Sequence, residues 1–237
     1  LLASMASLAE RRPDLLQRCF LKQDIDKGVY MMKFYGCSYH GQKECVVLMD
    51  DVLAMNKNKP IELNYCQPQG YGKGKKKKND LRMWSVLMEQ AYCKIIGGNY
   101  KENDGGSMHV AITNITGMKG QMIRKYSTFD KETFDRFKEM DAGDIFTAKT
   151  SSNVKNGLLP NQSYSILDCK EVDNIQLIKL RNPFGNNKGE WNGDYCDHSN
   201  KWTKRLRKKV QFEKNKNDGI FWMTVQDWFY HFTSLYV

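Results

Sequence analysis

The residues of this chain that could do chemistry lie in its last third. Gln162 carries a carboxamide, which has no pKa near neutrality and can therefore neither take a proton from a reacting group nor give one to it. Three acidic residues, Glu190, Asp197 and Asp218, follow in polar segments. Carboxylates in flexible loops can bind a hard cation, although acids in such loops are as often ordinary solvated surface.

Length and composition describe a chain that can build a core. Its 237 residues are enough for one large domain or two smaller lobes, and 41% of them are hydrophobic. This composition excludes a disordered polymer. No apolar run approaches the roughly 20 residues of a transmembrane helix, so no membrane span is expected. Residues 1–8 lack the features of a signal peptide, and the absence of an initial Met indicates a piece of a longer sequence.

Seven cysteines are scattered along the chain without a Cys-x-x-Cys pair, which argues against a zinc site. They are Cys19, Cys37, Cys45, Cys66, Cys93, Cys169 and Cys196. Several lie in apolar runs, as Cys93 does. We therefore expect reduced, partly buried thiols in a cytoplasmic protein.

The formal net charge of +10 is concentrated in two lysine-rich runs, at 73–78 and at 201–209. Both runs could attract an anionic lipid surface, and a solvated loop is the simpler interpretation of each. The first run has no interleaved aromatic residue that could stack on bases. A nucleic acid is therefore not an expected partner.

The first half of the chain is expected to be mostly helical. Residues 1–20 predict two helices with a break near Pro13. Seven apolar residues recur at helical spacing within 81–96, with Asp80 as the expected N-cap and Gly97 as the end of the helix. These patterns are typical of core-facing helices rather than of a cofactor site.

β-rich runs at 29–35 and 45–49, with turn residues between them, predict a hairpin. A second amphipathic helix is expected at 130–142, with Phe134 and Phe137 on its inner face. The strands expected after it are 145–149, 163–168, 175–182 and 220–224. This order of elements predicts an α+β protein with two lobes.

Four segments resemble, in their order and spacing, the catalytic domain of calpain-type cysteine proteases, a papain-like family. They are Asn161-Gln162-Ser163-Tyr164-Ser165, Leu180-Arg181-Asn182-Pro183-Phe184-Gly185, Glu190-Trp191 and Phe221-Trp222-Met223. In that family a Gly-His-Ala-Tyr-Ser strand carries the catalytic histidine, and an Arg-Asn-Pro-Trp-Gly strand carries the asparagine that orients it. Residues 84–92 are also similar to its Trp-Ser-Ala-Leu-Leu-Glu-Lys-Ala-Tyr helix.

The resemblance implies a papain-like α+β fold, with a helical first lobe at 1–117 and an antiparallel β second lobe at 118–237. It also implies a protein or peptide as substrate or binding partner. In such enzymes a thiolate attacks the peptide carbonyl, a histidine transfers protons, and an asparagine holds the histidine ring.

Two departures from the family pattern bear on activity. By the resemblance Asn182 would orient the histidine, yet Gln162 stands at the position of that histidine. The nucleophilic cysteine would lie two residues before Leu1, outside this sequence, and we interpret that as truncation. The candidates for another catalytic histidine are His40, His109, His198 and His231, and rescue by His109 would need an unusual backbone path.

The calcium site that the resemblance implies for the second lobe is weakened. Glu190, Asp197 and Asp218 match three of its four acidic ligands, whereas the fourth position holds Ile220. A ligand position of the first lobe reads Lys101.

Two functions from different classes stay open at this point. The first is a catalytically impaired or inactive calpain-like domain that acts as a binding or regulatory module. The alternative is an active calcium-dependent cysteine endopeptidase, truncated here, with an unrecognised base. A basic protein that binds lipid or nucleic acid is a third interpretation, which requires the lysine runs to lie on one face.

Overall fold

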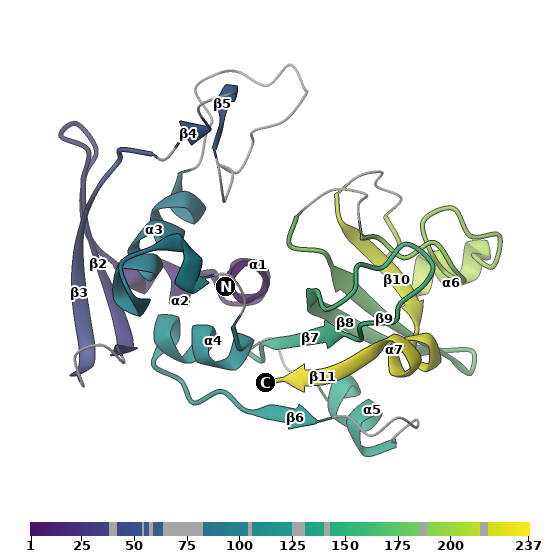
Figure 1. Ribbon diagram of the computed structural model, residues 1–237. Helices are drawn as coiled ribbons and strands as arrows, with labels where there is room; N and C mark the ends of the chain where they lie inside the picture. Colours follow the sequence, from purple (N-terminus) through teal and green to yellow (C-terminus); the bar gives the residue numbers. More distant parts are fainter. Residues whose placement is uncertain are drawn as a thin grey trace. The chain divides into compact units, whose positions relative to one another are not determined.

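The computed structural model describes residues 1–37, 42–53, 55–56, 59–63, 83–103, 106–124, 131–139, 143–184, 189–213 and 218–237 (Figure 1). It divides into two compact units. The first unit comprises Leu1 and Asp14–Lys119, and the second comprises Leu2–Pro13 and Gly120–Val237. Both units combine helices with antiparallel sheets, which confirms the α+β class. The lobes expected at 1–117 and 118–237 stay predictions, and the units differ from them because Leu2–Pro13 packs within the second unit.

The first unit contains an antiparallel sheet in the order β1-β2-β3. Its strands are β1 (Phe20–Asp24), β2 (Val29–Cys37) and β3 (Gln42–Asp50), and a separate pair is β4 (Met55–Asn56) with β5 (Lys59–Leu63). The expected hairpin is confirmed as β2 and β3. Met32 and Phe34 alternate along β2 and point into the core. The lysine run at 73–78 lies outside the described residues.

Helices cover this unit's core: α2 (Pro13–Cys19), α3 (Trp84–Ile96), the short 3₁₀ turn η1 (Tyr100–Asn103) and α4 (Met108–Thr116). The expected break at Pro13 is confirmed, because proline occupies the first turn of α2. The α3 helix ends at Gly97 as expected, but its N-cap is Met83; the expected cap, Asp80, lies outside the described residues. The α4 helix was not expected, and Gly117 ends it with a left-handed φ of 73°.

The second unit contains a six-stranded antiparallel sheet in the order β10-β9-β8-β7-β11-β6 (Figure 1). Its strands are β6 (Met122–Arg124), β7 (Phe146–Thr150), β8 (Ser163–Val172), β9 (Ile175–Arg181), β10 (Ile220–Thr224) and β11 (Phe232–Tyr236). The four strands expected from the sequence correspond to β7, β8, β9 and β10. The short strands β6 and β11 were not expected.

The helices of the second unit are α1 (Leu2–Arg11), α5 (Lys131–Lys138), α6 (Lys204–Lys209) and α7 (Val225–His231). The α5 helix buries Phe134 and Phe137, as its amphipathic pattern predicts. The α1 helix is bonded to the sheet: Ser7 Oγ donates to the carbonyl of Phe146 at 3.2 Å, and Arg11 Nη1 donates to the carbonyl of Leu167 at 2.8 Å.

Two apolar clusters form the core of the second unit. The larger one contains the buried rings of Tyr164, Phe221, Trp228 and Phe232. The smaller one lies under α6 and consists of Val172, Leu177, Trp202, Leu206, Val210 and Trp222. Both clusters include residues from β8, β9 and β10, so these three strands are packed against apolar side chains of both clusters.

The cysteines only partly match expectation. Cys19, Cys93, Cys169 and Cys196 are buried thiols that form no disulfide. Cys45 is disulfide-bonded, so the expectation that all thiols are reduced is wrong at that position. Within the described ranges, none of the helices combines the length and the hydropathy that crossing a bilayer requires.

Candidate functional site

Gln162 lies immediately before strand β8, where its backbone is fixed by Thr150 at the end of β7. The Gln162 N–H donates to Thr150 Oγ1 at 2.8 Å, and the Thr150 N–H donates to the Gln162 carbonyl at 2.9 Å. The side chain is half-buried, and its Nε2 donates to the carbonyl of the next residue, Ser163, at 3.2 Å. The position is therefore well defined, and it presents a carboxamide that does not titrate.

Asn161, the residue before Gln162, lies in a tight turn with left-handed backbone geometry. Its φ is 53°, in the left-handed region that glycine favours and that asparagine tolerates better than most residues. The Asn161 N–H donates to the Ser151 carbonyl at 3.0 Å, which holds this turn in place. The residue before Gln162 therefore has a backbone conformation that a glycine would also adopt readily.

Asn182 follows strand β9 and is fully buried. Its N–H donates to the Gly219 carbonyl at 2.7 Å, and its Oδ1 accepts from the Phe184 N–H at 3.2 Å. A Cβ at Gly189 would lie 2.9 Å from Asn182 Nδ2, so the carboxamide is closely packed against that glycine. The structure therefore fixes Asn182, while its role as the residue that would orient a histidine stays a prediction.

Tyr164 connects the loop before Gln162 to the loop after Asn182. Its hydroxyl donates to the Gly189 carbonyl at 2.8 Å and accepts from the Leu159 N–H at 3.1 Å. Burial raises the pKa of Tyr164 to about 12, so the hydroxyl keeps its proton and remains a donor.

The first turn of α1 lies beside strand β8. Ser165, three residues after Gln162, donates from its Oγ to the Ala3 carbonyl at 2.9 Å. In a papain-like enzyme the nucleophile sits at the start of this kind of helix, where the helix dipole favours a thiolate. The bond from Ser165 therefore fixes the start of α1 against strand β8.

Three of the four histidines lie among the residues that the structure describes. His231 is only 3% exposed, and its ring lies 5.3 Å from that of Trp191. His198 is exposed in the loop near Glu190, and His109 lies on α4 in the first unit. His40 lies outside the described residues.

A sequence model described as calpain family cysteine protease matches residues 1–237. The chain belongs to the calpain family. It is 30% identical over 224 residues to calpain-type cysteine protease DEK1 of Zea mays, a match that covers 90% of this chain and 10% of that protein. It is 31% identical to calpain clp-4 of Caenorhabditis elegans, over 89% of this chain and 29% of the relative. For calpain-13 of Rattus norvegicus the identity is 26%, over 100% of this chain and 35% of the relative.

These matches confirm the expected family and its cysteine protease domain. The chain spans about a tenth to a third of the length of the relatives named above. The activities of those whole proteins therefore come to this chain only as proposals.

The acids of the expected calcium site are held by backbone groups. Glu190 Oε1 accepts from the Gly219 N–H at 2.8 Å, and Asp218 Oδ1 accepts from the Ile220 N–H at 2.9 Å. Burial raises the pKa of Glu190; the Gly219 N–H opposes this shift and nearby Asp218 adds to it. Asp197 is buried in its own loop.

The donor set does not fit a calcium ion in this conformation. Across the part of the chain that the structure describes, no three His, Cys, Asp or Glu side chains are grouped as metal ligands. The structure therefore brings Glu190 and Asp218 near each other but does not assemble them with Asp197 into a site. Lys101, at the expected position in the first lobe, is exposed on η1.

Sequence reasoning missed the residues that connect the site: Thr150, Tyr164, Gly189 and Gly219. Gly219 accepts from Asn182 and donates to Glu190, so it links the end of β9 to the acidic loop. A tyrosine inside the family motif was the only signal for Tyr164. The two glycines have φ values of 86° and 79°, which mark them as positions of special backbone geometry.

Proposed function

We propose that this calpain-family domain does not hydrolyse peptide bonds and acts as a binding or regulatory module. The observation that carries the proposal is Gln162 at the start of β8, with its register supported by Thr150 and by the left-handed Asn161. A carboxamide cannot activate a thiol or protonate a leaving amine. Loss of one member of a catalytic triad costs roughly 10^4 to 10^6 in kcat.

The surrounding scaffold supports retention of binding without catalysis. Asn182 is fully buried and bonded to Gly219, and Tyr164 holds the two neighbouring loops together. A domain that keeps these contacts can still present a folded surface to a protein or peptide partner. Binding requires shape and hydrogen bonds, whereas hydrolysis also requires a group that moves a proton.

The test compares the full-length protein with its Gln162→His variant on an unfolded protein substrate. We expect the unaltered protein to show no turnover, and the variant to gain activity if the rest of the machinery is intact. Gln162→Asn is the matched control, because it changes the side chain without adding a proton acceptor. No turnover by any of the three proteins would indicate that catalysis has been lost at further residues as well. Turnover by the unaltered protein at the rate of Gln162→His would contradict the proposal.

We further propose, from membership of the calpain family, that the protein is cytoplasmic and binds calcium. Because Glu190, Asp197 and Asp218 are not grouped as metal ligands, calcium binding would require these loops to rearrange. A rise in the melting temperature of the full-length protein with calcium, abolished by Asp218→Asn, would support a site. An unchanged melting temperature would count against it.

A further inference from the structure

The second basic run of the chain, at 201–209, contains the short helix α6. Helix α6 lies in a segment with six cationic residues and no acid: Lys201, Lys204, Arg205, Arg207, Lys208 and Lys209. Thr203 caps the helix by accepting the Leu206 N–H on its Oγ1 at 3.1 Å. Leu206 is 2% exposed and packs in the cluster under α6, so the face that the helix turns outward is fixed.

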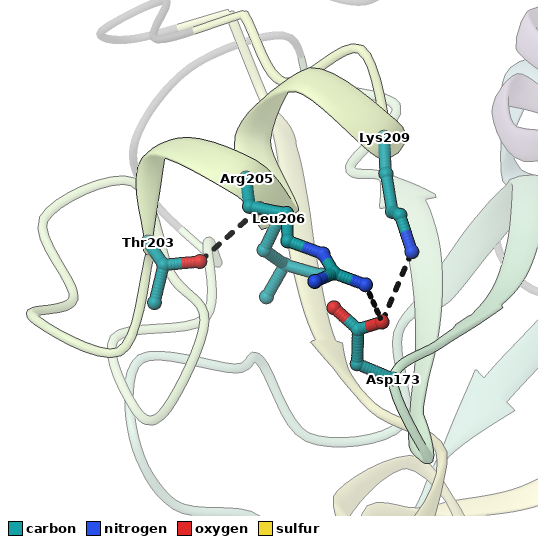
Figure 2. Close-up of polar contacts among 5 residues, drawn as sticks. All are labelled: Asp173, Thr203, Arg205, Leu206 and Lys209. Atoms are coloured by element: carbon teal, nitrogen blue, oxygen red, sulfur yellow. Dashed lines mark hydrogen bonds and ion pairs between the residues drawn. The ribbon is translucent and has the colours of Figure 1, made fainter.

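One carboxylate holds two of these cations against the body of the unit. Asp173, in the turn between β8 and β9, accepts from Arg205 Nη2 at 2.9 Å and from Lys209 Nζ at 3.0 Å on the same oxygen (Figure 2). The bond from Lys209 and the charge of Arg205 hold the pKa of Asp173 below its usual value. Figure 2 shows both side chains reaching from α6 to this carboxylate.

The other three cations of α6 lie on a different strip of the helix. Lys204, Arg207 and Lys208 follow the spacing of neighbours on a helix surface, and all three are exposed. The Arg207 guanidinium lies 5.5 Å from the centre of the Phe212 ring. Among the described residues, no carboxylate forms an ion pair with Lys204 or Lys208.

We propose that the outward face of α6, defined by Lys204, Arg207 and Lys208, docks on an anionic membrane surface. Lysines are compact hydrated point charges that suit a diffuse array of lipid headgroups. The aromatic residues at the helix do not suit a nucleic acid, because Trp202 is buried and Arg207 covers Phe212. The proposal does not depend on whether the domain has lost catalysis, because α6 is separate from Gln162 and Asn182.

The test measures binding of the full-length protein to sedimenting vesicles of phosphatidylcholine, with and without about one third phosphatidylserine. We expect binding only to the anionic vesicles, with weaker binding at about 300 mM than at about 50 mM salt. The double variant Lys204→Gln/Lys208→Gln should bind on the order of ten- to thirty-fold more weakly, since each surface cation contributes up to about fivefold in affinity. Lys22→Gln/Lys119→Gln, which removes the same charge from two exposed lysines of the first unit, is the matched control.

Asp173→Asn tests whether the carboxylate beside α6 weakens the attraction of this helix to anionic lipid. It removes the carboxylate that holds Arg205 and Lys209, so it should bind anionic vesicles at least as tightly as the unaltered protein. Equal loss of binding in the α6 double variant and in its control would overturn the proposal. Stronger binding to a single-stranded oligonucleotide or to polyglutamate than to the vesicles, at the same salt, would overturn it as well.

Discussion

The hydroxyl of Tyr164 donates a hydrogen bond to the backbone carbonyl of Gly189 at 2.8 Å. Tyr164 lies on β8 two residues after Gln162, and Gly189 lies in the loop between Asn182 and Glu190. This single contact therefore ties the two parts of the chain in which the family carries its histidine and its asparagine. The same hydroxyl accepts from the Leu159 N–H, so both loops depend on it.

Replacing Tyr164 by Phe should destabilise the domain by roughly 1–3 kcal/mol, because it leaves a buried carbonyl and a partly buried N–H without their partner. Urea denaturation of the full-length protein would measure this, with Tyr230→Phe as the control at an exposed tyrosine. Because burial raises the Tyr164 pKa from 10.0 to about 12, its contribution to stability is complete below pH 10 and is lost as the pH rises through 12. A variant as stable as the control would refute this role.

Replacing Gly189 by Ala should displace Asn182. The added Cβ would lie 2.9 Å from Asn182 Nδ2 and equally close to the Leu159 side chain. Gly98 is the matched control, because its φ of 76° imposes similar backbone strain and nothing lies within 4 Å of its Cβ. We expect Gly189→Ala to cost about 1–3 kcal/mol more than Gly98→Ala, measured as the difference in free energy of unfolding. Equal costs would show that the contact with Asn182 does not matter.

Replacing Glu190 by Gln should change how stability depends on pH. Burial raises the pKa of Glu190, so its favourable contribution is present below its ordinary pKa of 4.5 and is lost as the pH rises through the folded-state value. A glutamine keeps an acceptor for the Gly219 N–H without the buried charge. The variant should therefore gain stability relative to the unaltered protein between pH 4 and 7, measured by urea midpoints. Exposed Glu213→Gln is the control, and a difference that is constant with pH would contradict the prediction.

The buried thiols should not react in the native protein. Burial raises the pKa of Cys19 to about 11 and that of Cys169 to about 12, so almost no thiolate is present at neutral pH. Site-by-site mass spectrometry after mild iodoacetamide treatment should find both unmodified, and modified after unfolding in urea. Rapid native alkylation at either cysteine would indicate a reactive thiol that this structure does not explain.

Elements with strong periodicity and clear ends could be predicted from the sequence. The α3 stripe, ended by Gly97, and the hairpin of β2 and β3 are examples. The α4 helix could not, because its Gly- and Asn-rich surroundings indicate a loop, and burial of Met108 and Ile115 decides its conformation. The α6 helix could not be predicted either, because its run of cations is typical of a solvated segment. Burial of Leu206 stabilises this short helix.

Only those residues of the candidate site that lie within family motifs could be predicted from the sequence. Gln162 and Asn182 were identified by their place in two family motifs, and their roles stay predictions. The contacts that hold them, from Tyr164 to Gly189 and from Gly219 to Glu190, join loops that are distant in sequence. Such contacts depend on how β8, β9 and β10 pair in the sheet. The sequence pattern of a single segment does not predict that pairing.

The central claim is that Gln162 leaves the domain without the base that peptide hydrolysis needs. The most direct measurement is the turnover of a fluorescent unfolded protein substrate by the unaltered full-length protein, with and without calcium and with and without a thiol alkylator. We predict no turnover above background under any of these conditions. Turnover that an alkylator abolishes, and that persists in Gln162→Ala, would contradict the account by showing that another group transfers the proton.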